Sequence, residues 1–274
     1  MIRRILAALL LVLALPAAPR AGEPVFTVAV GGAERAYGRD DLLRRPDATT
    51  VTVEDGAYGR AMTYRAVPLA HLVPRESLAA GRVLEAVASD GFVAQMPLDL
   101  VFADTAAGAV PYLAVEPADA PWPDLPGKAV SAGPFYVVWL RPAASGVRSE
   151  HWPYQVVRIA DAESPAVRWP ELAVADTLAA DDPVRAGQAL FVTQCMSCHT
   201  LNGAGTATMG PDLNRPMNPT EYLRPGMLKR LVRAGSTIRT WPGRQMPDFT
   251  EAMLSDREIE RIVAYLEHMA GRKR

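Results

Sequence analysis

Both cysteines of this 274-residue chain lie in one short stretch, QCMSCHTLNG (194–203), separated by two residues and followed at once by a histidine. In an exported protein this spacing allows a disulfide, a metal site or thioether attachment of a haem. The adjacent His199 distinguishes them, because a dithiol redox motif needs no histidine there and a zinc site needs two further ligands at short spacing. The other histidines, His71, His151 and His268, offer no such pair.

We therefore expect one covalently bound haem c. Cys195 and Cys198 lie one helical turn apart, so that they can capture the two vinyl groups, and His199 is thereby placed under the iron as an axial ligand. The chain contains no other thiol that would compete by forming a wrong disulfide during export and haem attachment.

The N-terminus, MIRRILAALLLVLALPAAPRA (1–21), has the layout of a secretory signal peptide: an arginine pair, an apolar run and then small residues. The apolar run from Ile5 to Leu15 is shorter than the roughly 20 residues that cross a bilayer. We expect cleavage after Ala21, with Ala17 or Ala18 as alternatives. The mature protein is then periplasmic and has no transmembrane span.

About 250 residues remain after cleavage, which favours two domains. Short β-rich runs broken by Gly and Pro fill residues 25–160, with brief helical stretches such as Asp40–Arg45. Helical patterns replace them from Asp181 onward. We predict an N-terminal mixed α+β domain (22–161), a linker (162–180) and an all-α C-terminal domain (181–274). The net charge of −1 gives no basic field for nucleic acid.

Two predicted helices frame the C-terminal segment. The first, DDPVRAGQALF (181–191), can be capped by Asp181 or Asp182, and it carries Gly187 and Phe191 on one face. The second, SDREIERIVAYLEHMA (255–270), begins with a capping box, Ser255 to Glu258, and has an apolar stripe beside Tyr265.

With the C-x-x-C-H motif between these helices, residues 181–274 resemble class I cytochrome c domains. The resemblance implies that the two helices cross, with Gly187 allowing close approach and Phe191 and Tyr265 packing at the crossing. It also implies that the stretch GPDL (210–213) supplies the Pro211 carbonyl that accepts the proximal imidazole N–H, which orients His199 and tunes its basicity.

The sixth iron ligand is expected to be Met246, in WPGRQMPDF (241–249), because the following proline disfavours helix and an extended loop can carry the sulfur to the iron. His268 is the bis-histidine alternative. The other methionines of the domain are interpreted as core filler: Met209, Met217, Met227 and Met253.

Several residues near the methionine loop are candidates for contacts with the haem edge or a partner. Trp241, Arg239 and Arg244 flank Met246 and are expected near the haem propionates. Arg230 and Arg233, on the preceding predicted helix, are candidates for partner docking, although a solvated helix face explains them equally.

The N-terminal stretches TYRAVPLAHLV, VLEAVASDGFVAQMPLDLV and GPFYVVWLRP resemble parts of the molybdopterin-binding domain of the sulfite oxidase family. That family ligates molybdenum through a cysteine, and no cysteine exists here outside the haem motif. The segment is also shorter than a complete catalytic domain. We therefore expect a truncated, non-catalytic relative without molybdopterin. His71 is interpreted as a core residue of an apolar run, and His151 as a loop residue beside Trp152 and Pro153.

A histidine opposite a thioether closes the iron site, and such a site transfers electrons. We expect an electron-transfer protein rather than an enzyme, whose N-terminal domain docks a redox partner such as a periplasmic dehydrogenase or oxidase. The alternative is a haem-containing oxidoreductase whose N-terminal domain binds its own cofactor or substrate and passes electrons to the haem.

Overall fold

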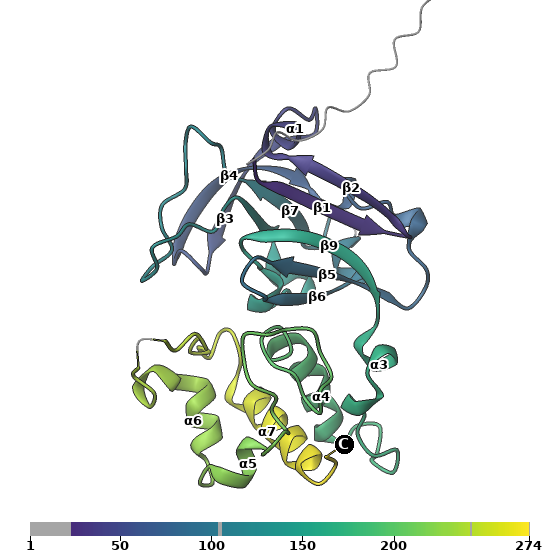
Figure 1. Ribbon diagram of the computed structural model, residues 1–274, viewed down its shortest axis with the longest axis vertical. Coiled ribbons are helices and arrows are strands. Elements are labelled where there is room, and N and C mark those ends of the chain that lie inside the picture. Colours follow the sequence, from purple (N-terminus) through teal and green to yellow (C-terminus); the bar gives the residue numbers. More distant parts are fainter. Residues whose placement is uncertain (1–22, 104–105, 242, 274) are drawn as a thin grey trace, which may run out of the picture.

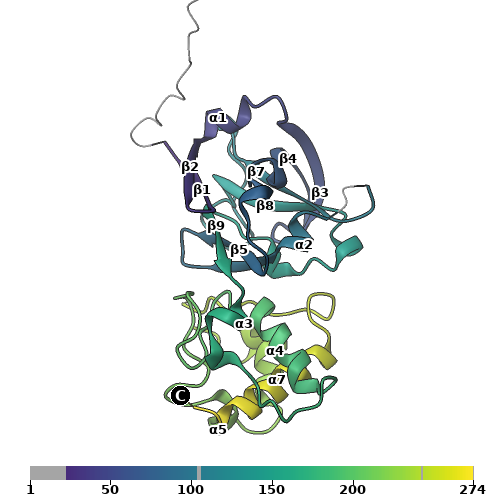
Figure 2. The ribbon, with the colours of Figure 1, turned by 90° about the vertical axis from the view of Figure 1, so that its right-hand side faces the viewer.

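The computed structural model describes residues 23–103, 106–241 and 243–273, so the expected signal peptide lies outside the described residues. The chain folds into a β-rich N-terminal domain stacked on a helical C-terminal domain (Figure 1). A view turned by 90° shows the same two layers, with the short helix α3 on the connection between them (Figure 2).

The strands of the N-terminal domain form two sheets. Strand order is β2-β1-β9-β5-β6 in one sheet and β3-β4-β7-β8 in the other, and β1 and β9 are the parallel pair. The strands are β1 (Val25–Val30), β2 (Ala33–Gly38), β3 (Thr49–Asp55), β4 (Arg60–Pro68), β5 (Arg82–Ala88), β6 (Val93–Pro97), β7 (Val110–Val115), β8 (Phe135–Leu140) and β9 (Val156–Glu163).

Strand β8 shows how the period of two in a strand builds the core. Phe135, Val137 and Trp139 join the cluster between the two sheets, whereas Tyr136 and Val138 join a second cluster on the outer face of their sheet. Because successive side chains point to opposite faces, both faces of this strand are buried. The region is thus β-rich with two packed sheets, and its helices are limited to short pieces.

The helical elements are mostly in the second half of the chain. They are α1 (Arg39–Leu43), η1 (Leu69–His71), η2 (Arg75–Ser77), α2 (Leu98–Val101), η3 (Pro142–Ser145), η4 (Ser149–His151), α3 (Pro165–Arg168), η5 (Pro170–Leu172), α4 (Pro183–Gln194), α5 (Pro219–Tyr222), α6 (Met227–Ala234), η6 (Gly235–Thr237) and α7 (Asp256–Ala270). None of the helices in the described part of the chain is long and apolar enough to cross a membrane.

The connecting segment is held at both ends. Arg168, at the end of α3, forms an ion pair with Glu85 of β5 at 3.1 Å. The carbonyl of Leu172 accepts a hydrogen bond from the Tyr265 hydroxyl of α7 at 2.8 Å, and Leu172 is buried in the helical core. The segment is therefore attached to the β domain on one side and to the helical domain on the other.

Candidate functional site

Helix α4 carries the two cysteines to their position. Its first turn is capped by the Asp182 carboxylate, which accepts the Val184 N–H at 2.9 Å, and Cys195 is its C-terminal cap residue. The N–H groups of Cys198 and His199 both donate to the Cys195 carbonyl, at 3.1 and 2.9 Å. The chain therefore makes one further turn, which places both thiols and the imidazole close together.

The two thiols are free and partly buried. Burial raises the pKa of Cys195 and of Cys198 to about 12, with a smaller contribution from the negative charge of Glu150. Redox-active dithiols instead have a depressed pKa, because the thiolate is the reactive species. The environment of these thiols thus differs from that of a disulfide oxidoreductase.

The imidazole of His199 is oriented by a hydrogen bond to the loop that follows. Its Nδ1 lies 2.8 Å from the Pro211 carbonyl, and because a carbonyl can only accept, Nδ1 carries the proton and Nε2 is left as the acceptor. Burial lowers the pKa of His199, although the bond to Pro211 raises it in part, so the imidazole is favoured in its neutral form. A neutral imidazole with a free Nε2 is the form that binds a metal.

Gly210 lets the loop pass directly against this imidazole. A Cβ atom at Gly210 would lie 2.5 Å from the Nδ1 and Cε1 atoms of His199 and 3.0 Å from the Cys198 carbonyl oxygen. The Gly210 N–H also donates to that carbonyl at 2.7 Å. The absence of a side chain is therefore required for the Pro211 carbonyl to reach the ring.

Asp212 holds the rest of this loop, a role that the sequence analysis missed. Its carboxylate accepts the Thr200 hydroxyl and the N–H groups of Gly203, Asn214 and other loop residues, at 2.7 to 3.2 Å. Burial alone would raise the pKa of Asp212, but these donors lower it below its usual value. The position of this aspartate, directly after a Gly-Pro pair in a predicted loop, was the sequence signal that could have indicated its role.

Three buried asparagines fasten the same loop to α7, and the sequence analysis missed them too. Asn214 Nδ2 donates to the Asn202 side-chain oxygen and to the Met269 carbonyl, both at 2.8 Å. Asn218 Nδ2 donates to the Asn214 side-chain oxygen and to the Leu266 carbonyl, both at 2.9 Å. These bonds tie the loop to backbone carbonyls in the last two turns of α7.

Helices α4 and α7 cross closely, as the sequence predicted. A Cβ atom at Gly187 would lie 2.0 Å from the Arg261 carbonyl oxygen, and the rings of Phe191 and Tyr265 lie 5.4 Å apart. The capping box at the start of α7 is also confirmed: Ser255 accepts the Glu258 N–H, and the Glu258 carboxylate accepts the Ser255 N–H at 2.9 Å.

Met246 lies in the irregular segment between η6 and α7 and is partly buried, packing against the same helical core as Cys195. Two neighbours fix this segment. Phe249 is buried and donates its N–H to the Val232 carbonyl at 3.2 Å, and Asp248 accepts the Ser236 N–H at 2.8 Å. Burial alone would raise the pKa of Asp248, but the hydrogen bonds from Ser236 outweigh this effect and lower the pKa below its usual value. The carboxylate therefore stays charged.

The remaining methionines differ in their surroundings. Met209 Sδ lies 3.9 Å from Cys198 Sγ, and Met227 Sδ lies 3.9 Å from a guanidinium nitrogen of Arg230. Met253 packs against the helical core. The interpretation of Met217 as core filler is wrong: it is 50% exposed, although it directly precedes the buried N-cap residue of α5, Asn218.

The basic residues near the methionine loop serve different purposes. The Arg239 guanidinium lies 5.3 Å from the ring centre of Trp241, which is 53% exposed. Arg244 donates to the Met246 carbonyl and pairs with Asp248 at 3.5 Å. Trp241 is thus an exposed ring with the partly buried Arg239 beside it, whereas Arg244 shapes the loop.

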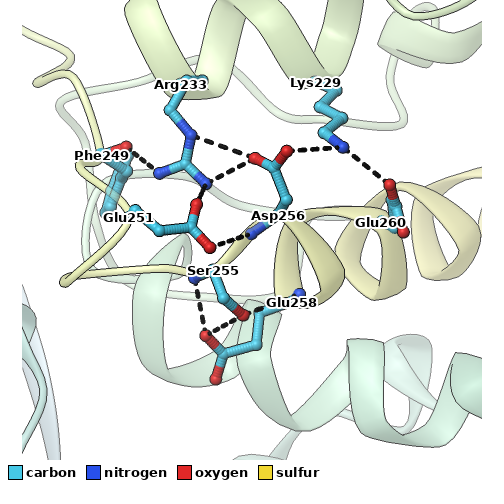
Figure 3. Close-up of polar contacts among 8 residues, drawn as sticks. All are labelled: Lys229, Arg233, Phe249, Glu251, Ser255, Asp256, Glu258 and Glu260. Carbon is cyan, nitrogen blue, oxygen red and sulfur yellow. Dashed lines mark hydrogen bonds and ion pairs between the residues drawn. The ribbon is translucent and has the colours of Figure 1, made fainter.

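Arg233 is engaged within the domain. Figure 3 shows its guanidinium between Glu251 and Asp256, at 2.7 Å from each carboxylate, and donating to the Phe249 carbonyl. Lys229 bridges Asp256 and Glu260 at 3.0 and 2.7 Å. The cationic face of α6 is therefore largely neutralised by α7 and the loop before it.

The other three histidines lie elsewhere. The interpretation of His71 as a core residue is wrong: it ends η1, its side chain is 56% exposed, and it contacts Asp47 at 3.0 Å. His151 is buried in η4 rather than in an open loop, and burial lowers its pKa to about 4. His268 Nε2 accepts the Ala175 N–H at 3.1 Å, so it is bound to the connecting segment.

The N-terminal domain contacts the cysteine turn directly, which the sequence did not reveal. The Val93 N–H of β6 donates to the Ser197 carbonyl at 3.1 Å, between the two cysteines. In the turn before β6, a Cβ atom at Gly91 would lie 2.6 Å from the Thr208 hydroxyl. One end of the β domain therefore rests on the segment that carries the thiols.

These donors fit a haem c: two free thiols one turn apart, a neutral imidazole with Nε2 free, and a thioether on a fixed loop. Residues 184–270 match the protein-family model described as Cytochrome c. This segment is a cytochrome c domain, which indicates haem binding and a haem-based electron-transfer role. No curated protein matches the chain.

Proposed function

We propose that the chain is a periplasmic electron-transfer protein that carries one covalent haem c, ligated by His199 and Met246. The observation that supports this most strongly is the hydrogen bond between His199 Nδ1 and the Pro211 carbonyl, 2.8 Å long, beside two thiols that are free and uncharged. The bound haem supplies a one-electron redox centre, and its axial ligands set its potential.

Each residue of the site has a defined part in this proposal. Cys195 and Cys198 anchor the haem, His199 binds the iron through Nε2, and Pro211 orients the imidazole and raises its basicity. Met246 brings a thioether, which favours the reduced state and closes the site to outside ligands. The exposed Trp241 and the partly buried Arg239 lie at the edge of the methionine loop, where a haem propionate or a partner can contact them.

The N-terminal domain acts as a docking module in this proposal. Its support is that it rests on the cysteine turn through the bond from the Val93 N–H to the Ser197 carbonyl. A redox protein partner would bind the surface of this domain or the methionine-loop side of the haem domain.

Haem attachment tests the proposal. The protein, produced together with haem-maturation factors, is extracted with acidified acetone. We expect one haem to remain with each chain, because thioether bonds survive conditions that break axial bonds. Cys195→Ala and Cys198→Ala should each leave attachment incomplete. Haem that extracts freely from the unaltered protein would refute the proposal.

A further inference from the structure

Glu150 is a carboxylate of the N-terminal domain that the proposed function leaves without a role. It lies in η4, which packs against β6 and against α4, the helix that leads into the cysteine turn. Its negative charge acts on both Cys195 and Cys198 and raises the pKa of each thiol. A side chain of the β domain therefore belongs to the immediate electrostatic surroundings of the haem-attachment residues.

No cation neutralises this carboxylate from the elements packed against it. Neither β6, VAQMP, nor the last two turns of α4, QALFVTQ, contains a charged residue. The nearest arginine in sequence, Arg148, has its guanidinium 2.6 Å from the Glu258 carboxylate. His151 is buried and uncharged, since its pKa is lowered to about 4 and its Nδ1 accepts the Arg148 N–H.

A second acid also acts on the cysteine turn. Asp90, in the turn between β5 and β6, acts on Cys198 together with Glu150. The polar partner of Glu150 among the described residues is the Ser149 hydroxyl, which donates to its Oε1 at 3.2 Å. Part of Glu150 is still accessible to water, but the surrounding protein desolvates the carboxylate and raises its pKa to about 7, against a smaller lowering by Ser149.

We propose that Glu150 is a proton-binding site coupled to the redox state of the haem domain, contributed across the interface by the N-terminal domain. This inference rests on the proposed function, because it requires a redox centre attached to Cys195 and Cys198. One electron from an external reductant lowers the positive charge of that centre by one. The proton affinity of Glu150 then rises, so a fraction of the molecules take one proton from solvent onto a carboxylate oxygen and release it on oxidation.

The sign follows from Coulomb's law. The oxidised centre carries one more positive charge, so it stabilises the carboxylate and lowers the pKa of Glu150 relative to the reduced state. The midpoint potential should therefore fall as pH rises through the range around pH 7 that the pKa of Glu150 sets. The midpoint potential cannot fall by more than about 59 mV for each pH unit, which is the slope for one proton per electron.

The test is a spectroelectrochemical titration of the full-length holoprotein between about pH 5 and pH 9, bracketing the Glu150 pKa of about 7. We expect the proton affinity of Glu150 to differ at least threefold between the redox states. At about 59 mV for each tenfold change, this corresponds to a total change of about 28 mV in the midpoint potential. Glu150→Gln should remove this shift while keeping size and polarity. Glu54→Gln, an exposed acid of β3, should behave like the unaltered protein.

Ser149→Ala is a second variant in case Glu150→Gln does not fold. It removes the hydrogen bond that lowers the pKa of Glu150, so the pH range of the shift should move upward. A potential independent of pH in the unaltered protein, a shift that Glu150→Gln retains in full, or a range that Ser149→Ala leaves in place would overturn the inference. In each of these cases the covalent haem and the reversible potential would remain, whereas their loss would refute the proposed function itself.

Discussion

The guanidinium of Arg148 in the N-terminal domain lies 2.6 Å from the carboxylate of Glu258 in the first turn of α7. This ion pair joins residues 110 positions apart and fastens the β domain to the haem domain beside the cysteine turn. Both side chains are at least half-buried. Burial would raise the pKa of Glu258, but Arg148 and Ser255 lower it below its usual value.

The first prediction concerns this pair. Arg148→Met keeps much of the apolar stem but removes the charge, and we expect it to lower the free energy of unfolding by about 1 kcal/mol, since the guanidinium is partly solvated. Because the folded state depresses the pKa of Glu258, the contribution is present above the unfolded pKa and is lost as pH falls through the folded value. Urea unfolding should show a lower free energy of unfolding for Arg148→Met than for the unaltered protein at neutral pH. The two values should become equal at acidic pH.

Arg44→Met is the matched control. Arg44 pairs with Asp40 at 3.6 Å, but its side chain is 72% exposed. Exposed ion pairs contribute little, so we expect a change within about 0.5 kcal/mol. An equal loss in both variants would show that the Arg148 contact contributes no more than an ordinary surface pair.

The second prediction tests the helix crossing. Gly187→Ala places a methyl group 2.0 Å from the Arg261 backbone oxygen and 2.9 Å from the Tyr265 Cβ atom, so the two helices must shift apart. Overpacking of this kind costs about 1–3 kcal/mol, although alanine itself favours helix. The midpoint of denaturant unfolding, followed by haem absorbance, should fall accordingly.

Gly56→Ala provides the comparison, because nothing lies within 4 Å of the added Cβ atom. Its unfolding midpoint should stay close to that of the unaltered protein. If Gly187→Ala were as stable as Gly56→Ala, the close approach of α4 and α7 described here would be incorrect.

Local signals explain which parts of the fold could be predicted. The caps Asp182 and Ser255, Gly187 and the C-x-x-C-H spacing all act within one or two helical turns, so α4, α7 and the attachment turn were readable in sequence. Residues 25–160 were readable as β-rich for the same reason. The strand order was not, because β1 pairs with the distant β9 through contacts that no local pattern encodes.

Contacts between distant segments explain the wrong and missed residues. His71 sits in an apolar run, but it ends a short 3-10 turn and its ring faces Asp47, 24 residues away. Arg233 looked like a free cation on a helix face, yet two acids from the next segment bind it. Glu150 had no sequence signal, because its burial depends on how the two domains dock.

The third prediction concerns the loop beneath the proximal histidine. Asp212→Asn removes the charge that five donors hold, and we expect a loss of about 1–3 kcal/mol from the unmatched groups. Since the folded state lowers the pKa of Asp212, this stabilisation is present above the unfolded pKa and disappears as pH falls through the folded value. In thermal unfolding at neutral pH, Asp212→Asn should unfold at a lower temperature than the unaltered protein. At about pH 3 this difference should disappear.

Asp119→Asn, in an exposed loop of the N-terminal domain, should change the unfolding temperature little at either pH. A stability difference between Asp212→Asn and the unaltered protein that persists unchanged into acid would contradict the charge-based explanation of the loop.

The fourth prediction concerns Met246, whose thioether defines the site as an electron carrier. Met246→Leu nearly conserves volume and apolarity, so packing in the helical core should change little. Water or an added ligand can then reach the iron, and the potential should fall because the ligand that favours the reduced state is lost. Potentiometric titration measures this, and Met209→Leu, Met217→Leu, Met227→Leu and Met253→Leu should leave the potential near its original value.

Near-infrared absorption of the ferric protein tests the central claim most directly. We predict that the unaltered protein shows the weak sulfur-to-iron charge-transfer band and that its ferrous form binds carbon monoxide poorly, whereas Met246→Leu loses the band and binds carbon monoxide readily. If Met246→Leu kept the band, or if the unaltered protein lacked it and bound carbon monoxide freely, the closed site ligated by His199 and Met246 would be contradicted.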